Sequence, residues 1–60
     1  MTPEEIRAAR TALGFTQLQL ANALGLMGPR AERTVEDWEG GRRKPPAYLK
    51  LALEYLARPV

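Results

Sequence analysis

Apolar residues recur along this chain at helical spacing, and Gly and Pro residues divide the pattern into four stretches. Each stretch has start and stop signals that favour a helix over a strand. The pattern predicts one all-helical domain over residues 1–60, a compact four-helix unit with helices at about 3–13, 16–24, 29–39 and 46–58.

The first two predicted helices begin with the same motif. Thr2 and Thr16 are N-cap residues with Glu5 and Gln19 three positions later, which is the spacing of a capping box. A glycine follows each helix and supplies the conformation that ends it. The apolar residues expected in the core of this half are Ile6, Ala9, Leu13, Phe15, Leu20, Ala21, Leu24 and Leu26.

The third predicted helix has two contrasting faces. Pro29 is expected at its first position, where a missing N–H has no cost. At about 100° per residue, one face consists of Ala31, Val35 and Trp38. This spacing predicts a core role for Trp38 in preference to base stacking. The opposite face is charged and is centred on Arg33, with Arg30, Glu36 and Asp37 beside it.

The fourth predicted helix is unusually apolar. One stripe, expected in the core, consists of Leu49, Ala52, Leu53 and Leu56. A second stripe on an adjoining face consists of Tyr48, Leu51 and Tyr55. Three partner helices can hardly cover both stripes, so the second is a candidate dimer interface. The alternative, given equal weight, is that both tyrosines lie along the flank of the domain with their hydroxyls in water.

The charged residues are nearly balanced, with nine Lys and Arg against seven Asp and Glu and a net charge of +2. Their positions matter more, because Arg42, Arg43 and Lys44 form a basic run that by itself is typical of a solvated loop. The chain has no Cys and no His, which removes disulfides and nearly all zinc chemistry as supports for so small a core. Dimerisation is therefore the expected source of extra stability.

No apolar run approaches the ~20 residues that span a bilayer. The N-terminal residues are polar and acidic, whereas a signal peptide begins with basic and then apolar residues. We therefore expect a soluble, cytoplasmic protein with no membrane partner.

Two motifs in this chain resemble those of the lambda-repressor-like, Cro-type helix-turn-helix family of phage and bacterial regulators. They are Thr-Gln-x-x-Leu-Ala-x-x-Leu-Gly at 16–25 and Trp-Glu-x-Gly at 38–41, and the likeness extends over about residues 4–56. The sequence departs from the family at residues 27–33, where an insertion of roughly one helical turn precedes the Thr34-Val35 pair. This insertion either lengthens the third helix at its start or enlarges the turn before it.

The resemblance implies a sequence-specific DNA-binding regulator, most simply a homodimeric repressor on an inverted repeat. The family includes phage repressors, antitoxins that repress their own operons and small anti-CRISPR-associated regulators. Gln17 resembles the family residue that contacts a phosphate and braces the recognition helix, and Thr16 would be a cap first and a contact second. The loop residues Arg42, Arg43 and Lys44 resemble the backbone-contacting segment of the family.

The residues of the third helix also favour DNA on physical grounds. A major groove admits a helix that is anchored on one face and carries fixed donors and acceptors on the other. Arg33 and Arg30 are the candidates for guanine, since a guanidinium forms two parallel bonds with it. Glu36 or Asp37 would accept from cytosine or, more simply, hold the arginines in place.

An enzyme is not expected, because the chain lacks His, Cys and a spaced pair of carboxylates with a cleft to hold it. We expect no cofactor, metal or small-molecule ligand. The alternative from another functional class is an antitoxin-like interaction module whose fourth helix binds a different protein.

Overall fold

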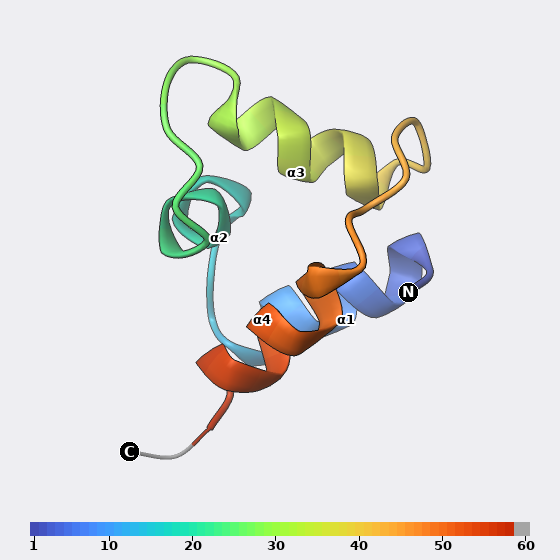
Figure 1. The fold of residues 1–60 in the computed structure, drawn as a ribbon, viewed down its shortest axis with the longest axis vertical. Coiled ribbons are helices and arrows are strands. Elements are labelled where there is room, and N and C mark those ends of the chain that lie inside the picture. The colour runs from blue at the N-terminus through green and yellow to red at the C-terminus, as the bar shows by residue number, and fades with distance from the viewer. Residues whose placement is uncertain (59–60) are drawn as a thin grey trace.

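The computed structural model describes residues 1–58, and within that range it contains helices and no strand. The helices are α1 (Pro3–Ala12), α2 (Gln17–Ala23), α3 (Ala31–Glu39) and α4 (Tyr48–Leu56). Figure 1 shows α3 higher in the view than α1 and α4, with α2 near the end of α3 at which the chain arrives. The predicted all-helical class is confirmed, although each observed helix is shorter than its prediction.

Both predicted capping boxes are present. The hydroxyl of Thr2 accepts from the backbone N of Glu5 at 3.2 Å, and the Glu5 carboxylate accepts from the N of Thr2 at 2.7 Å. The corresponding distances between Thr16 and Gln19 are 3.1 and 2.8 Å. These bonds occupy N–H groups that have no acceptor within their own helix. Because Thr16 is the N-cap, α2 begins at Gln17 and not at residue 16.

The first two helices also end one residue before their predicted ends. Leu13 and Leu24 are the C-cap residues, and Gly14 and Gly25 follow them with φ of +75° and +84°. The chain turns at these glycines because a left-handed residue lets the next N–H groups bond back to the last carbonyls. The glycines therefore end α1 and α2 as predicted.

The third helix begins two residues later than predicted. Gly28 has φ of +93°, and its carbonyl accepts from the N of Ala31 at 3.2 Å, closing a turn that contains Pro29 and Arg30. Pro29 therefore precedes α3, and Arg30 is an N-cap whose side chain makes no capping bond. Residues 24–30 separate α2 from α3. Of residues 27–33, where the insertion is predicted, 27–30 lie in the connection before α3 and 31–33 form its first turn.

The end of α3 fixes the start of the basic loop. Gly41 has φ of +75°, and its N donates to the carbonyl of Trp38 at 3.4 Å. The next residue, Arg42, donates from its N to the carbonyl of Asp37 at 2.9 Å. This pair of bonds around a left-handed glycine is a Schellman motif, which returns the chain alongside the helix it has just left.

The fourth helix is shorter than the predicted 46–58 at both ends. The carbonyl of Pro46 accepts from the N of Leu49 at 3.1 Å, so the chain makes a turn before the helix begins at Tyr48. At the other end Ala57 is the C-cap. The predicted stop signal, Pro59, lies outside the described residues.

The core lies where the four helices meet, and Trp38 is within it at 3% exposure. The predicted core role of this residue is confirmed. Fully buried apolar residues are Ile6, Leu20, Ala21, Ala31, Val35, Trp38, Leu49 and Leu53. Half-buried apolar residues that pack against them are Ala9, Leu13, Phe15, Leu24, Leu26 and Leu56.

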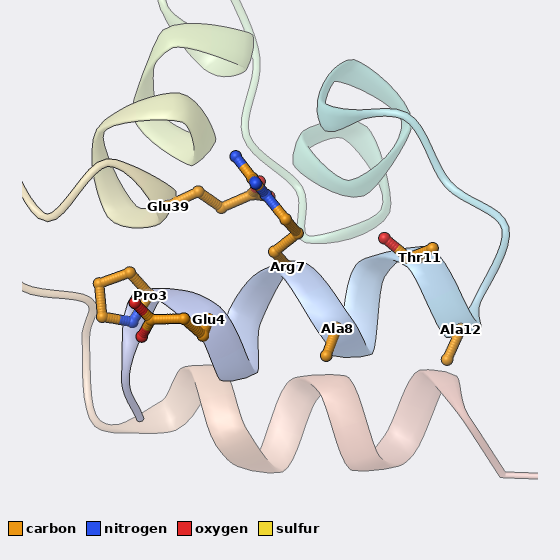
Figure 2. A pocket seen from close by; sticks show the side chains of 7 residues that line it. All are labelled: Pro3, Glu4, Arg7, Ala8, Thr11, Ala12 and Glu39. Carbon is orange, nitrogen blue, oxygen red and sulfur yellow. The ribbon is translucent and has the colours of Figure 1, made fainter.

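The helices do not contact one another equally. The most extensive helix pair is α2 with α3, and α1 also packs against α3. In both figures α4 runs beside α1 (Figures 1 and 2). Among the described residues, no helix combines the length and apolar character needed to cross a bilayer.

Candidate nucleic-acid interface

The exposed surface of α3 has a basic flank and an acidic flank. Helical geometry places Arg30 and Asp37 on one side of Arg33, and Glu32 and Glu36 on the other. Arg33, Glu32 and Glu36 are exposed, whereas Asp37 is half-buried. Arg33 lies opposite the core face, between the two flanks. The predicted charged face is therefore present. Glu32 and Glu36 form its acidic flank, and the flank with Arg30 is basic because Arg33 and Arg42 offset the charge of Asp37.

Asp37 binds arginines from two different segments. Its Oδ1 accepts from the Nε of Arg33 at 3.3 Å and lies 3.7 Å from the Nη1 of Arg42. Its backbone carbonyl also accepts from the N of Arg42 and of Arg43, at 2.9 and 3.3 Å. Asp37 thus orients Arg33 along the helix and attaches the start of the basic loop to α3.

The basic loop contributes to two separate surfaces. Arg43 lines a hollow beside α3 together with the predicted site residues Arg30, Arg33 and Asp37. Its neighbour Lys44 lines a different hollow, together with Met1 and Lys50. The structure therefore gathers the arginines beside α3 and leaves Lys44 on the side of the N-terminus and α4.

The two predicted phosphate contacts at the start of α2 have partners within the protein. The hydroxyl of Thr16 accepts the capping bond from Gln19, in agreement with its predicted first role. Gln17 is half-buried, and its Nε2 donates to Oε1 of Glu39 at 3.4 Å. Gln17 therefore contacts the C-terminal end of α3, which is the contact expected of a residue that braces this helix.

Glu39 joins three helices and was not among the predicted site residues. Its side chain is 2% exposed, and its two oxygens accept from the Nε and Nη2 of Arg10 at 2.6 and 3.1 Å. Arg10 also donates from Nη1 to the carbonyl of Phe15 at 2.8 Å. With Gln17 from α2, these bonds place the end of α3 against α1 and the start of α2.

The ionisation of Glu39 is set by opposing effects. Burial by itself would raise the pKa of its carboxyl, but the hydrogen bonds and positive charge of Arg10, helped by Gln17 and Arg7, outweigh burial and lower that pKa. The bond to Glu39 raises the pKa of Arg10, against a smaller opposing effect of burial. Both groups are charged at neutral pH, so the pair is an ion pair in which Glu39 is buried and Arg10 is half-buried.

The positions of Arg10 and Glu39 in the sequence already indicate that they pair. Glu39 follows Val35 by four positions and lies on the edge of the face that carries Ala31 and Trp38. Arg10 follows Ile6 by four positions and precedes Leu13 by three, so it lies on the core stripe of α1. A charged residue on the core face of each of two helices, one positive and one negative, indicates a buried pair.

The second stripe of α4 is open to solvent. Tyr48, Leu51 and Tyr55 are 57%, 68% and 72% exposed. Lys50 and Glu54 are also exposed and lie along one side of the stripe. The stripe is therefore a continuous apolar face with a charged margin.

A hollow of about 590 Å³ lies along α1. Figure 2 shows Arg7 reaching from α1 toward Glu39 and the end of α3. Ala8 and Ala12 line the same hollow and are exposed. The Nε of Arg7 is 3.5 Å from Oε1 of Glu39. This hollow contains none of the residues predicted to contact DNA.

Comparisons of the chain with protein-family models, with curated protein sequences and with solved structures give no match. The function must therefore be inferred from the side chains and their arrangement. The most informative arrangement is that of α3, which is buried on one side and on the other exposes Arg33, bonded to Asp37.

Proposed function

We propose that this protein is a sequence-specific DNA-binding transcriptional regulator, in which α2 and α3 form a lambda-repressor-like helix-turn-helix and α3 enters the major groove. The observation that carries the proposal is the position of Arg33. It stands on the surface of α3 opposite Val35 and Trp38, and Asp37 orients it at 3.3 Å. A recognition helix needs such an anchored face behind a fixed donor, because a mobile side chain distinguishes bases poorly.

The base-reading contact assigned to Arg33 is a bidentate bond to guanine O6 and N7. Glu36 is exposed one turn further along α3 and would accept from a cytosine amino group. Asp37 serves to hold the arginines, since its carboxylate is already engaged by Arg33 and Arg42. A base that pairs with Arg33 therefore meets a guanidinium that the exposed bond to Asp37 biases toward one direction.

Contacts to the DNA backbone come from the segments at both sides of α3. Arg42 and Arg43 are exposed in the loop after α3, where they neutralise phosphates without reading sequence. Lys44 lines the separate hollow on the side of the N-terminus and lies away from this surface. Thr16 and Gln17 stand at the start of α2, where backbone N–H groups also suit a phosphate. These contacts set the position of α3 along the groove.

We further propose that the protein acts as a homodimeric repressor on an inverted repeat. The exposed stripe of Tyr48, Leu51 and Tyr55 is the proposed interface. If two α4 helices pack antiparallel about a two-fold axis, Lys50 of one copy faces Glu54 of the other, so the charged margin is self-complementary. Two half-sites about one helical turn of DNA apart, near 34 Å, would be contacted, and the bound dimer would block RNA polymerase.

The same exposed stripe favours one alternative, an antitoxin-like module that binds a different protein through α4. The two functions differ in what α4 contacts. A homodimer buries Tyr55 against its own copy, whereas the module stays monomeric until its partner is present.

The proposal is tested by selecting bound duplexes from a random pool at near-physiological salt and titrating the enriched sequence. We expect a palindromic sequence bound at nanomolar concentration. Arg33→Ala should weaken binding to it by about 1–3 kcal/mol and relax the preference at one base pair per half-site. Weak, strongly salt-dependent binding with no enriched sequence would contradict sequence-specific recognition and favour the protein-binding alternative.

A further inference from the structure

A hollow of about 420 Å³ follows the basic flank of α3. Arg30, Arg33, Thr34 and Asp37 have the spacing i, i+3, i+4 and i+7, which places them in one row along the helix. Arg43 lines the same hollow from the loop after α3. Figure 1 shows that the segment before α3 and the loop after it lie at opposite ends of this helix. The hollow is thus bounded by arginines from both connecting segments.

The arginines that line this hollow differ in whether a carboxylate of the protein binds them. Arg33 is bound to Asp37, and that carboxylate also lies 3.7 Å from Arg42. Neither Arg30 nor Arg43 forms an ion pair with a carboxylate of residues 1–58, and both are exposed. The charge of Asp37 is therefore neutralised by its own partners. Arg30 and Arg43 remain as two uncompensated positive charges facing one cavity.

We propose that this hollow holds one backbone phosphate of the bound duplex, contacted by Arg30 from before α3 and by Arg43 from after it. The inference rests on the proposed function, and it replaces the base-reading role that the sequence analysis expected for Arg30. Arg30 becomes a phosphate contact, while Arg33 remains the base-reading residue because Asp37 directs it along the helix.

The position of Arg30 supports this role over base reading. Arg30 precedes α3 and makes no capping bond, so no neighbour sets the direction of its side chain as Asp37 does for Arg33. A phosphate accepts from a guanidinium over a wide range of approach directions, whereas a base edge requires one alignment. The acidic flank of Glu32 and Glu36 is repelled by the backbone, so the basic flank of α3 is turned toward the phosphates.

The test uses the full 60-residue chain and the duplex obtained by selection. Binding is measured across a salt series for the wild type, Arg30→Ala, Arg43→Ala and the double variant. Each single variant should weaken binding to the selected duplex and to a random duplex by the same factor. Because the two arginines of one copy contact the same phosphate, the double variant should reduce the slope of log K against log salt by about 0.9 per bound copy, or about 1.8 for a dimer on two half-sites. Arginines that contacted separate phosphates would reduce it by twice that amount.

A second measurement locates the phosphate. Duplexes carrying a single neutral methylphosphonate are compared one position at a time. The wild type should lose affinity at one position per half-site at which the double variant loses none. Arg7→Ala, on α1 outside the proposed DNA-facing surface, is the matched control and should keep both the slope and the methylphosphonate profile of the wild type.

Two results would overturn the inference while leaving the proposed function intact. One is a loss in Arg30→Ala confined to the selected duplex, with relaxed preference at one base pair, which would make Arg30 a base-reading residue. The other is a set of methylphosphonate profiles that are the same in the wild type and the double variant. Failure of the proposed function looks different, because the wild type itself would then prefer no duplex.

Discussion

The guanidinium of Arg10 meets the carboxylate of Glu39 side-on, with Nε 2.6 Å from Oε2 and Nη2 3.1 Å from Oε1. The two residues are 29 positions apart in the chain. A bidentate bond of this kind fixes both distance and orientation between the groups it joins. It therefore determines how the end of α3 sits on α1, and through α3 it determines how Arg33 is presented.

Removing one member of this pair should be strongly destabilising. Arg10→Met leaves the carboxylate of Glu39 buried without its main partner, at an expected cost of about 3–5 kcal/mol. A 60-residue domain has a total stability of similar size, so the variant should be largely unfolded at room temperature. Denaturant unfolding followed by the fluorescence of Trp38, the single tryptophan, measures this loss.

Two comparison variants separate charge burial from a general loss of packing. Arg10→Met combined with Glu39→Leu removes both charges and should recover most of the stability. Arg7→Ala removes an arginine that is 68% exposed and 3.5 Å from Glu39, and it should cost less than about 1 kcal/mol. An Arg10→Met protein as stable as the wild type would show that the pair does not hold α3 in place.

Stability should fall in acid because of Glu39. The pKa of the folded Glu39 carboxyl lies below its ordinary value of 4.5, so the unfolded chain takes up a proton first as the pH is lowered. The contribution of the pair is complete above about pH 4.5 and is lost as the pH falls through the lower, folded pKa. Denaturant midpoints measured from pH 7 to pH 3 follow this loss. The variant with both charges removed should show a smaller fall over the same range.

Asp37 should affect specificity and affinity in opposite directions. Asp37→Asn removes a negative charge beside the phosphates, so binding to random DNA should become tighter. The same change weakens the bond that orients Arg33, so the ratio of specific to random binding should fall several-fold. Competition titrations with the selected and random duplexes give both quantities. A ratio of specific to random binding equal to that of the wild type would show that Asp37 does not orient Arg33.

The left-handed glycine after α3 should matter for both folding and binding. Gly41→Ala places a Cβ on a residue with φ of +75°, which costs about 1–2 kcal/mol even though the nearest side-chain atom is 3.8 Å away. The strain shifts the basic loop, so DNA affinity should fall as well. Gly41→Asn should cost less, since Asn tolerates this conformation better than Ala. Equal unfolding midpoints for the wild type, Gly41→Ala and Gly41→Asn would show that residue 41 does not need the left-handed conformation of the Schellman motif.

Substitution on the exposed stripe of α4 should separate the two copies. Tyr55→Arg places a charge within the proposed interface and should give monomers in sedimentation experiments while helical content is retained at high concentration. Lys50→Glu should also weaken the dimer, and adding Glu54→Lys should restore it, because the paired charges are then exchanged. A dimer unaffected by Tyr55→Arg would place the interface elsewhere.

The local signals in the sequence predicted the elements well, because each acts within a few residues. Thr2 and Thr16 cap helices through bonds to residues three positions away, and Gly14 and Gly25 end them. The predicted helix starts were less accurate where they relied on a proline. Pro29 is compatible with the first turn of a helix, but the turn closed by Gly28 places it outside α3.

The candidate site was predicted less completely, because its arrangement depends on contacts between distant segments. The division of α3 into a core face and a charged face follows from spacing alone. The path of the loop after α3 places Arg43 near Arg30 and Lys44 near Met1. The residue types in the loop do not specify this path. Glu39 was missed because its sequence neighbours are acidic and glycine residues typical of an exposed helix end.

Glu39 draws its partners from α1 and α2, and no side-chain hydrogen bond among residues 1–58 links α4 to the rest of the molecule. We therefore expect the first three helices to open together, while α4 is held by the apolar contacts of Leu49 and Leu53 with the core. In hydrogen exchange, the amides of α4 should open at lower free energy than those of α3. A second copy covering α4 would reverse this order, so amide protection in α4 reports directly on assembly and rises with protein concentration.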